Sequence, residues 1–322
     1  MTFAELKEGD FFDPRFINEN VAFTQSQFYG EWHKALGRKV RRFLIKEGER
    51  PSLFAQVIKF SLPFGKSFLY TPYGPVVEGE PSAELIKFAK ESFNRVVREE
   101  KSIFMRFDSS FALGRKVSGV GASGYFQPRE EWLLDLDKSE EETLTMMEKD
   151  HRYSIRTGEK KGVEVIFIDK VSEYFDKFYL LLSETGKRNK FGLLPKSYYK
   201  AIFDSLEKNQ NGFLAIASFE EEVLAMNLII THGDSAHYLL GSSASKLREK
   251  MPTYLLQWAT IKHLKEKGIK KYNLGGVDVW ESLAKYKKGF GGHTLNHGGM
   301  YDLVGEPLWY FLYKMRKMLN KR

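Results

Sequence analysis

The stretch Gly275–Gly292, GGVDVWESLAKYKKGFGG, decides how the fold of this chain is interpreted. It begins as a glycine-rich exit from the apolar strand expected at 272–274, and it ends in a second glycine-rich turn. Between the two turns the sequence predicts a short amphipathic helix. The apolar face of that helix is formed at helical spacing by Leu283, Tyr286 and Phe290.

Lys287 lies at the edge of this aromatic face, whereas Lys285 and Lys288 point away from it. Held between two glycine-lined turns, Lys287 is placed to direct an ammonium into a cleft. The alternative is a solvated basic helix end, where cations offset the helix dipole. Charge runs usually face water, so the sequence alone favours this second interpretation.

The composition indicates a globular protein with a modest positive charge. A chain of 322 residues can hold two domains of ordinary size, and 42% hydrophobic and 15% aromatic residues allow large cores. The net charge of +8 favours a polyanionic partner, such as a nucleic acid, a nucleotide or an anionic membrane surface. We therefore expect basic surfaces to contribute to binding.

The chain contains no cysteine, which excludes disulfides, thiol nucleophiles and thiolate metal sites. The N-terminal sequence MTFAELKEGDFF lacks the charged and apolar regions of a signal peptide. No apolar run approaches the roughly 18 residues typical of a membrane span. These features predict a cytoplasmic protein.

Patterning predicts two α+β halves with mixed sheets, divided after the strand 132–136. Prolines at 72 and 75 and the glycine between them make 70–78, YTPYGPVVE, a fixed loop. Helices are expected at 23–36, 82–100, 139–160, 174–187, 196–208, 252–267 and 307–322. Strands are expected at 40–46, 52–61, 66–70, 102–107, 132–136, 162–168, 213–219, 223–231, 236–240 and 270–274.

The helix expected at 139–160 begins with capping-box spacing between Ser139 and Glu142. Its basic side carries Lys149 and three further cations, Arg152, Arg156 and Lys160, at helical spacing. Such a stripe can follow the phosphates of a nucleic acid, or it can be a solvated face, which we favour.

A literal G-x-G-x-x-G occurs at Gly119, Gly121 and Gly124. A dinucleotide fingerprint must open a helix directly after a strand. Here Gln127-Pro128 and a predicted strand follow instead, so we interpret the motif as a loop.

Several landmarks occur in an order that resembles the FemABX family of peptidoglycan bridge-forming aminoacyltransferases, over nearly the whole chain. They are Gln25-Ser26 before Trp32, the YTPYGPVVE loop, Trp132-Leu133-Leu134-Asp135-Leu136, Arg152 and Arg156 before KKGVEV, Thr185-x-x-Arg188-x-x-Phe191, Tyr238-x-x-Gly241-Ser242-Ser243, and Tyr272-Asn273-Leu274-Gly275-Gly276 leading to Tyr286-Lys287-Lys288-Gly289-Phe290-Gly291.

The resemblance implies an α+β fold of two GNAT-like domains with mixed sheets. The first would comprise 1–136 with 300–322 and bind the precursor, and the second would comprise 137–299 and face the aminoacyl-tRNA. Some family members carry a long helical-hairpin arm, but no long charged heptad run occurs here, so we expect none.

The resemblance also implies the reaction: an amino acid moves from aminoacyl-tRNA to the side-chain amine at the third position of a peptidoglycan stem peptide. The acceptor would be a UDP-linked muropeptide or a lipid-linked precursor, which would allow contact with the inner membrane surface. No cofactor and no metal are implied, and we expect a monomer.

Six positions match residues to which the family gives a role. In the first domain, Lys34 resembles the precursor-binding lysine, Tyr73 the loop contact to the precursor, and Glu78 the acidic residue that closes the loop. In the second, Arg188 resembles the arginine that reaches the nucleotide phosphates, Tyr238 the tyrosine before the Gly-Ser-Ser turn, and Lys287 the lysine of an F-K-x-x-F-type motif. A second tyrosine often found near Tyr238 is Leu240 here, many members have a basic residue at Tyr73, and Glu78 is often aspartate.

The chemistry suits these residue types. An aminoacyl ester is already activated, so no covalent nucleophile is needed. Glu78 could bind and orient the acceptor amine or accept its proton, and its alternative role is that of an exposed loop acid. Lys287 could stabilise the oxyanion of the tetrahedral intermediate. Arg188 could instead be a helix-end cation.

Other functions remain open. A GNAT acyltransferase would hold acyl-CoA on a glycine-containing loop, but the turn at 245–252 has no glycine, so CoA is not expected. His293 and His297 lack the glutamate of a zinc motif. A non-enzymatic RNA- or membrane-surface binder is a further alternative, although the apolar stripe of the last helix, at Leu308, Leu312, Met315 and Leu319, more often packs on a core.

Overall fold

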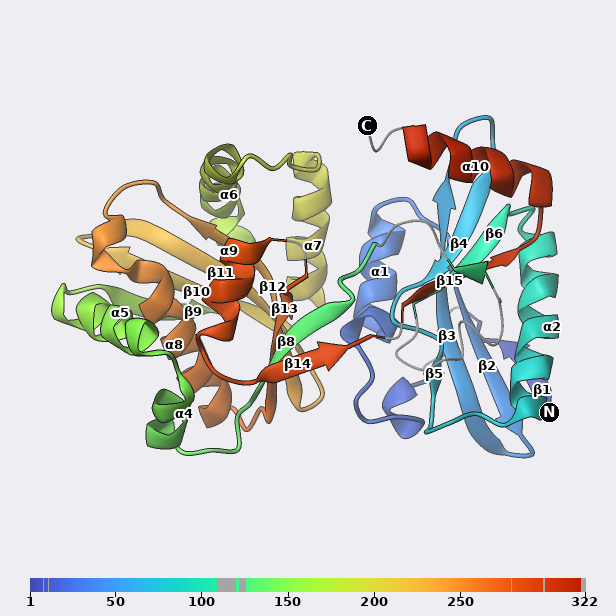
Figure 1. Ribbon diagram of the computed structural model, residues 1–322, viewed down its shortest axis with the longest axis horizontal. Helices are drawn as coiled ribbons and strands as arrows, with labels where there is room; N and C mark the ends of the chain where they lie inside the picture. The colour runs from blue at the N-terminus through green and yellow to red at the C-terminus, as the bar shows by residue number, and fades with distance from the viewer. Residues whose placement is uncertain are drawn as a thin grey trace. The chain divides into compact units, whose positions relative to one another are not determined.

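The computed structural model describes residues 1–319 apart from 8, 11, 109–119, 122–125, 279 and 298, and 120–121 by backbone alone. The chain divides into two compact units (Figure 1). Unit 1 comprises Met1–Arg129 with Asn296–Arg322, and unit 2 comprises Glu130–Leu295. Most of the G-x-G-x-x-G loop lies outside the described residues.

Unit 1 is built on one mixed sheet in the order β1-β2-β3-β4-β6-β15-β7, with the short β5 paired to β3. Within it β4 and β6 run parallel, and β15 lies antiparallel between β6 and β7. The strands are β1 (Thr2–Glu5), β2 (Val40–Glu47), β3 (Arg50–Ser61), β4 (Ser67–Thr71), β5 (Val76–Val77), β6 (Phe104–Asp108), β7 (Val120–Gly121) and β15 (Met300–Val304).

Helices cover both faces of this sheet, because alternate residues of each strand point to opposite sides. The long helix α2 (Ala83–Glu99) begins at its cap Ser82 and packs its apolar side against one face. The C-terminal helix α10 (Pro307–Leu319) packs Tyr310 on the other face, against Phe68 and Phe104. The described part of unit 1 also contains η1 (Pro14–Phe16), η2 (Phe23–Gln25) and α1 (Gln27–Ala35), the last capped by Ser26 as expected.

The end of the chain completes unit 1 through a buried ion pair. Arg106 of β6 donates two hydrogen bonds to Asp302 of β15, at 2.7 and 2.8 Å, and both side chains are almost fully buried. The Tyr310 hydroxyl of α10 donates to the same carboxylate at 2.9 Å. One carboxylate therefore ties the last strand and the last helix to the centre of the sheet.

Unit 2 has a second mixed sheet, in the order β14-β8-β13-β12-β11-β10-β9. Helix α8 packs against α5 in the core on one face, and α6 contacts β12. The strands are β8 (Glu130–Asp135), β9 (Glu164–Ile168), β10 (Gly212–Phe219), β11 (Glu222–His232), β12 (Ser235–Ser243), β13 (Lys271–Gly276) and β14 (His293–Asn296). The helices are α4 (Glu140–Met146), α5 (Lys149–Lys160), η3 (Val171–Tyr174), α6 (Phe175–Asn189), α7 (Lys196–Asn209), η4 (Arg248–Lys250), α8 (Pro252–Glu266) and α9 (Glu281–Lys288).

Strands β12 and β13 are parallel but pair over a short length. The pairing runs from Ser235 with Lys271 to His237 with Asn273 and then stops. Beyond it, residues as far as Ser243 of β12 still pair with β11 on the other side. The two strands therefore diverge in the middle of the sheet, and the candidate site lies at this divergence.

The structure differs from two expectations from the sequence. The single helix expected at 139–160 is wrong: Met147 is extended and buried, and the Glu148 amide donates to the Gly289 carbonyl at 2.9 Å, so the chain bends between α4 and α5. The unit boundary also lies before β8 rather than after 136, because Leu133 and Leu134 pair with β13. The capping box of Ser139 and Glu142 is confirmed.

The structure has no long helical arm among its described residues. The longest described helix is α2, with 17 residues, and α6 and α7 have 15 and 14. This agrees with the GNAT-like plan without a hairpin insertion.

Candidate functional site

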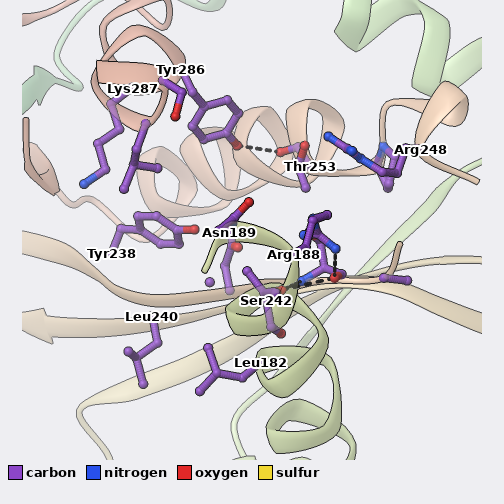
Figure 2. A pocket seen from close by; sticks show the side chains of 18 of the residues that line it. Leu182, Arg188, Asn189, Tyr238, Leu240, Ser242, Arg248, Thr253, Tyr286 and Lys287 are labelled. Atoms are coloured by element: carbon purple, nitrogen blue, oxygen red, sulfur yellow. Dashed lines mark hydrogen bonds between the residues drawn. The ribbon is translucent and has the colours of Figure 1, made fainter. Parts of the chain in front are cut away.

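A cleft of about 1150 Å³ opens in unit 2 where β12 and β13 diverge (Figure 2). Its walls come from the C-terminal half of α6, the second half of β12, the start of α8, and α9. Figure 2 shows Lys287 and Tyr238 towards one end of the cleft and Arg188 and Arg248 towards the other. The cleft thus combines aromatic surface with cations from separate elements.

Lys287 of α9 is only 6% exposed, and its Nζ donates to the Gly276 carbonyl at 2.8 Å. Burial lowers the pKa of this ammonium to about 8, against the opposing effect of Glu131 and Asp278. It therefore remains protonated at neutral pH. The interpretation of Lys287 as part of a solvated helix end is wrong, although Lys285 is exposed as that interpretation expects.

The turn that receives Lys287 is fixed by a buried amide. The Asn273 side chain accepts from the Gly275 amide at 2.7 Å and donates to Glu131 at 2.8 Å. Gly275 has a φ of +77°, and a Cβ there would lie 3.4 Å from the Lys287 Nζ. Asn273 was given no role from the sequence, where its signal is an amide between the apolar residues Tyr272 and Leu274.

The side chain of Tyr238 lies against Gly241, which is why position 241 requires a glycine. A Cβ at Gly241 would lie 1.7 Å from the Tyr238 hydroxyl, so any larger residue would displace the phenol. Burial raises the pKa of Tyr238 to about 12, which keeps the phenol neutral and able to donate. Nearby, the Tyr286 hydroxyl donates to the Thr253 carbonyl at the start of α8, at 3.0 Å.

Arg188 holds the end of β12. Its guanidinium donates to the Ser243 carbonyl at 3.1 Å, to the Ser243 hydroxyl at 2.7 Å and to the Ser245 hydroxyl at 3.0 Å. Burial, and then the charge of Arg248, lower the pKa of Arg188. The arginine is therefore a fixed cation of the cleft wall rather than a solvated helix end.

The basic stripe of α5 separates into two kinds of residue. Arg152 donates to the Leu144 and Met147 carbonyls, so it satisfies the C-terminal end of α4. Arg156 and Lys160 are exposed. With Lys149, which is exposed as well, they have the solvent access that a phosphate contact needs.

Lys34, Tyr73 and Glu78 belong to unit 1. Lys34 is half-buried at the end of α1 and pairs with Glu31 at 3.2 Å. Glu78 follows β5, is exposed, and pairs with the exposed Arg50. Its surroundings in unit 1 are those of an exposed loop acid.

The proline-containing loop of unit 1 is held from within. Tyr73 has a φ of +49°, its hydroxyl donates to the Pro128 carbonyl at 3.0 Å, and its ring stacks on His297 with 3.9 Å between ring centroids. The Pro72 carbonyl accepts from Thr24 at 2.9 Å and from Gln25 at 2.7 Å. This loop presents a rigid surface.

The structure thus brings Lys287, Tyr238 and Arg188 together in one cleft, whereas the other three matched residues lie in unit 1. Within the described residues, no group of three or more His, Asp or Glu side chains has metal-binding spacing. Nor does that part of the chain contain a helix long and apolar enough to cross a membrane.

Sequence comparison gives relatives over most of the chain. A GNAT acetyltransferase domain model matches residues 147–288, which include the whole cleft region. The lipid II:glycine glycyltransferase of Staphylococcus aureus is 22% identical over 94% of this chain and 93% of its own length. That of Staphylococcus haemolyticus is 22% identical over 84% of each chain.

The chain is similar in fold to FemX. The crystal structure of FemX superposes with a TM-score of 0.78 at 19% identity, covering 96% of this chain and 99% of FemX. A tandem GNAT protein from the clavulanic acid pathway superposes with a TM-score of 0.56 at 10% identity, over 83% of each chain. The resemblance to the FemABX family and the GNAT-like fold are confirmed, and the relatives and the fold together support an enzyme of the aminoacyltransferase class.

Proposed function

We propose that this protein moves an amino acid from aminoacyl-tRNA onto the side-chain amine at the third position of a peptidoglycan stem peptide. The names of the relatives support peptidoglycan bridge synthesis, since those proteins are lipid II:glycine glycyltransferases. The observation that carries the proposal is the buried ammonium of Lys287 in the cleft between diverging strands.

In this proposal the cleft of unit 2 takes the aminoacyl end of the tRNA. Arg188 and Arg248 suit the phosphates near that end, and the aromatic side chains of the wall suit the terminal bases. Arg156 and Lys160 are exposed cations of the same unit that a longer tRNA contact would use. Arg152 instead stabilises the C-terminal end of α4 by donating to the Leu144 carbonyl.

Lys287 stabilises the charge that develops during transfer. The acceptor nitrogen attacks the ester carbonyl carbon, and the carbonyl oxygen becomes an oxyanion. An ammonium has three donors, of which one is used by Gly276, so two remain for this oxygen. A well-placed donor of this kind contributes about 3 kcal/mol to the transition state. The carbon–oxygen bond to the ribose then breaks, and the proton from the amine passes to the ribose oxygen.

The acceptor amine has an ordinary pKa near 10.4, so it must lose a proton before attack. Glu78 is proposed to bind and orient this amine, and Lys34 and Tyr73 to contact the precursor. The exposure of Glu78 leaves it accessible to a substrate. The acceptor is either UDP-linked or lipid-linked, and the two share the same stem peptide.

The test is a transfer assay with the full chain. It uses a pool of radiolabelled aminoacyl-tRNAs and, in separate arms, a UDP-muropeptide and a lipid-linked precursor with a third-position diamine. Lys287→Met is assayed in parallel, and Lys285→Met, an exposed lysine of the same helix, is the matched control.

Label on one acceptor, about a hundredfold slower in Lys287→Met and unchanged in Lys285→Met, would support the proposal and name the amino acid. Label on neither acceptor would refute it. A GNAT-like enzyme with another amine acceptor, or an RNA-binding protein that kept the fold, would then be the better interpretation.

A further inference from the structure

Helix α10 presents an apolar face to solvent. Four of its side chains are more than half exposed: Leu308 at 71%, Phe311 at 59%, Met318 at 63% and Leu319 at 68%. Leu312 and Met315 continue the same face. The expectation that this stripe packs on a core is therefore wrong, and the most apolar side of the helix is left outside.

The helix docks on unit 1 through its opposite, aromatic side. Tyr310 is buried against the sheet and bonds to Asp302, and Tyr313 packs in the same cluster. Trp309 lies at the edge of this contact, with Lys66 above its ring at 4.8 Å. Because this inner face fixes the rotation of the helix, the outward direction of the apolar face is fixed as well.

Basic residues flank the outer face on both sides. At 3.6 residues per turn, the six exposed apolar residues span an arc of about 120° around the helix axis. Lys314 lies about 40° beyond one edge of this arc, and Arg316 lies about 40° beyond the other. Lys317 lies on the inner side, beside the rings of Phe126 and Tyr313. The sequence 307–322 carries Lys or Arg at 314, 316, 317, 321 and 322 and no acidic residue.

The loop between β3 and β4 extends this surface. Phe64 at its tip is 85% exposed, and its ring centroid is 6.4 Å from that of Trp309. Between this loop and α10 lies an apolar groove of about 430 Å³, with Arg316 among its lining residues. Lys66 at the groove pairs with Glu306 at 2.7 Å, so the acidic residue next to the helix is neutralised.

We propose that α10 and Phe64 form a docking surface for an anionic phospholipid bilayer. An apolar arc flanked by lysine and arginine is the pattern of a helix that lies in the membrane interface. A second copy of the chain fits less well, because a symmetric contact would bring like-charged edges together. RNA fits less well too, since the outward side chains are mainly aliphatic and offer little stacking. This surface goes beyond the proposed transfer reaction and does not depend on it.

The first test is flotation of the full chain with vesicles of phosphatidylcholine, with and without phosphatidylglycerol, in the absence of tRNA and acceptor. Phe311→Ser with Met318→Ser should weaken binding to the anionic vesicles by at least about tenfold. The matched control is Leu180→Ser with Leu194→Ser, two exposed apolar residues of unit 2, which should leave binding unchanged. Unaltered circular dichroism shows that each variant is folded.

The second test separates charge from apolar contact. Lys314→Gln with Arg316→Gln should reduce binding to the anionic vesicles about 30-fold at low salt, at roughly fivefold per cation, and should have little effect on neutral vesicles. Lys87→Gln with Lys90→Gln changes the net charge equally on exposed positions of α2 and should have no effect.

Three outcomes would overturn the proposal. They are no binding of the wild-type chain to anionic vesicles, equal binding by the Phe311→Ser and Met318→Ser double variant, and a wild-type dimer that this variant dissociates without any vesicle binding. In the second of these cases, weaker tRNA binding by the same double variant would assign the surface to RNA. None of these readouts requires transfer activity, so failure of the proposed function would not be mistaken for failure of the surface.

Discussion

Replacement of Lys287 by methionine should make the protein more stable while it slows transfer about a hundredfold. The ammonium is buried, and among the described residues the Gly276 carbonyl hydrogen bond and the weaker attraction of Glu131 and Asp278 compensate for lost hydration. Methionine has a similar length and no charge to desolvate. The lysine therefore costs folding free energy at neutral pH.

The size of this cost follows from the pKa. A decrease from 10.5 in the unfolded chain to about 8 in the folded chain corresponds to about 3 kcal/mol. The variant also loses the hydrogen bond to Gly276, which reduces this gain in stability by about 1 kcal/mol. Lys287→Met should thus raise the free energy of unfolding by about 2 kcal/mol near neutral pH, whereas the exposed Lys285→Met should change it by less than about 0.5 kcal/mol.

The same pKa fixes how the difference depends on pH. Between about pH 8 and 10.5 the unfolded chain still holds the proton that folded Lys287 has released, so wild-type stability rises relative to the variant in this window. The advantage of Lys287→Met should shrink by about 2 kcal/mol between about pH 7.5 and pH 9.5. Urea denaturation of the wild type and both variants at these two pH values measures the change, because contributions of all other groups cancel in the comparison.

The transfer activity of the wild type should fall over the same pH range in which its stability relative to the variant rises. Since the protonated form of Lys287 stabilises the oxyanion, wild-type kcat should fall as pH rises through about 8. The reasoning would be refuted by a Lys287→Met protein that is less stable than wild type near neutral pH, or by a difference that does not narrow at alkaline pH. Either result would mean that the ammonium is hydrated in the folded protein.

Four further substitutions test single contacts. Arg188→Ala, which removes three hydrogen bonds at the end of β12, should raise the KM for aminoacyl-tRNA at least about tenfold and weaken its salt dependence, as measured by initial rates. Glu78→Gln should leave the melting temperature unchanged, because its ion pair is exposed, but should raise the KM for the acceptor. Asp302→Asn should destabilise the protein by about 3–5 kcal/mol in urea denaturation, because it leaves the buried Arg106 without its carboxylate. Asn273→Ala should lower kcat about tenfold with little change in KM and should displace the alkaline limb of the pH profile, because the turn that fixes Lys287 is loosened.

Local patterns in the sequence predicted the element that carries Lys287 but not its environment. Helical spacing and two glycine turns were enough to place α9 and its aromatic face. Whether Lys287 faces water depends on the divergence of β12 from β13, which is a property of the sheet. The same limit explains why Asn273 was missed, since its partner Glu131 is 142 residues away.

The two helices whose environment was misjudged show a second limit. Periodicity identified the apolar stripe of α10, but aromatic residues occupy the other side of the same helix, and the pattern could not say which side packs. In the region 139–160 the capping box was correct, while the break at Met147 depends on the distant Gly289 carbonyl. Strand β15 was not predicted, because its ion pair joins residues 196 positions apart.

The position of the cleft gives a physical reason for a buried lysine at this point in the fold. Where β13 turns away after Asn273, one backbone edge of β12 no longer has a strand beside it. Gly275, with its positive φ, lies in the register shift between β13 and β8, and the following Gly276, which pairs with Glu131 of β8, uses its carbonyl to anchor the Lys287 ammonium. An extended substrate lying along β12 would thus place a carbonyl between a strand edge and a fixed cation that is shielded from water. In such a site the ammonium acts at a low local dielectric, so the desolvation that lowers its pKa also strengthens its interaction with an oxyanion.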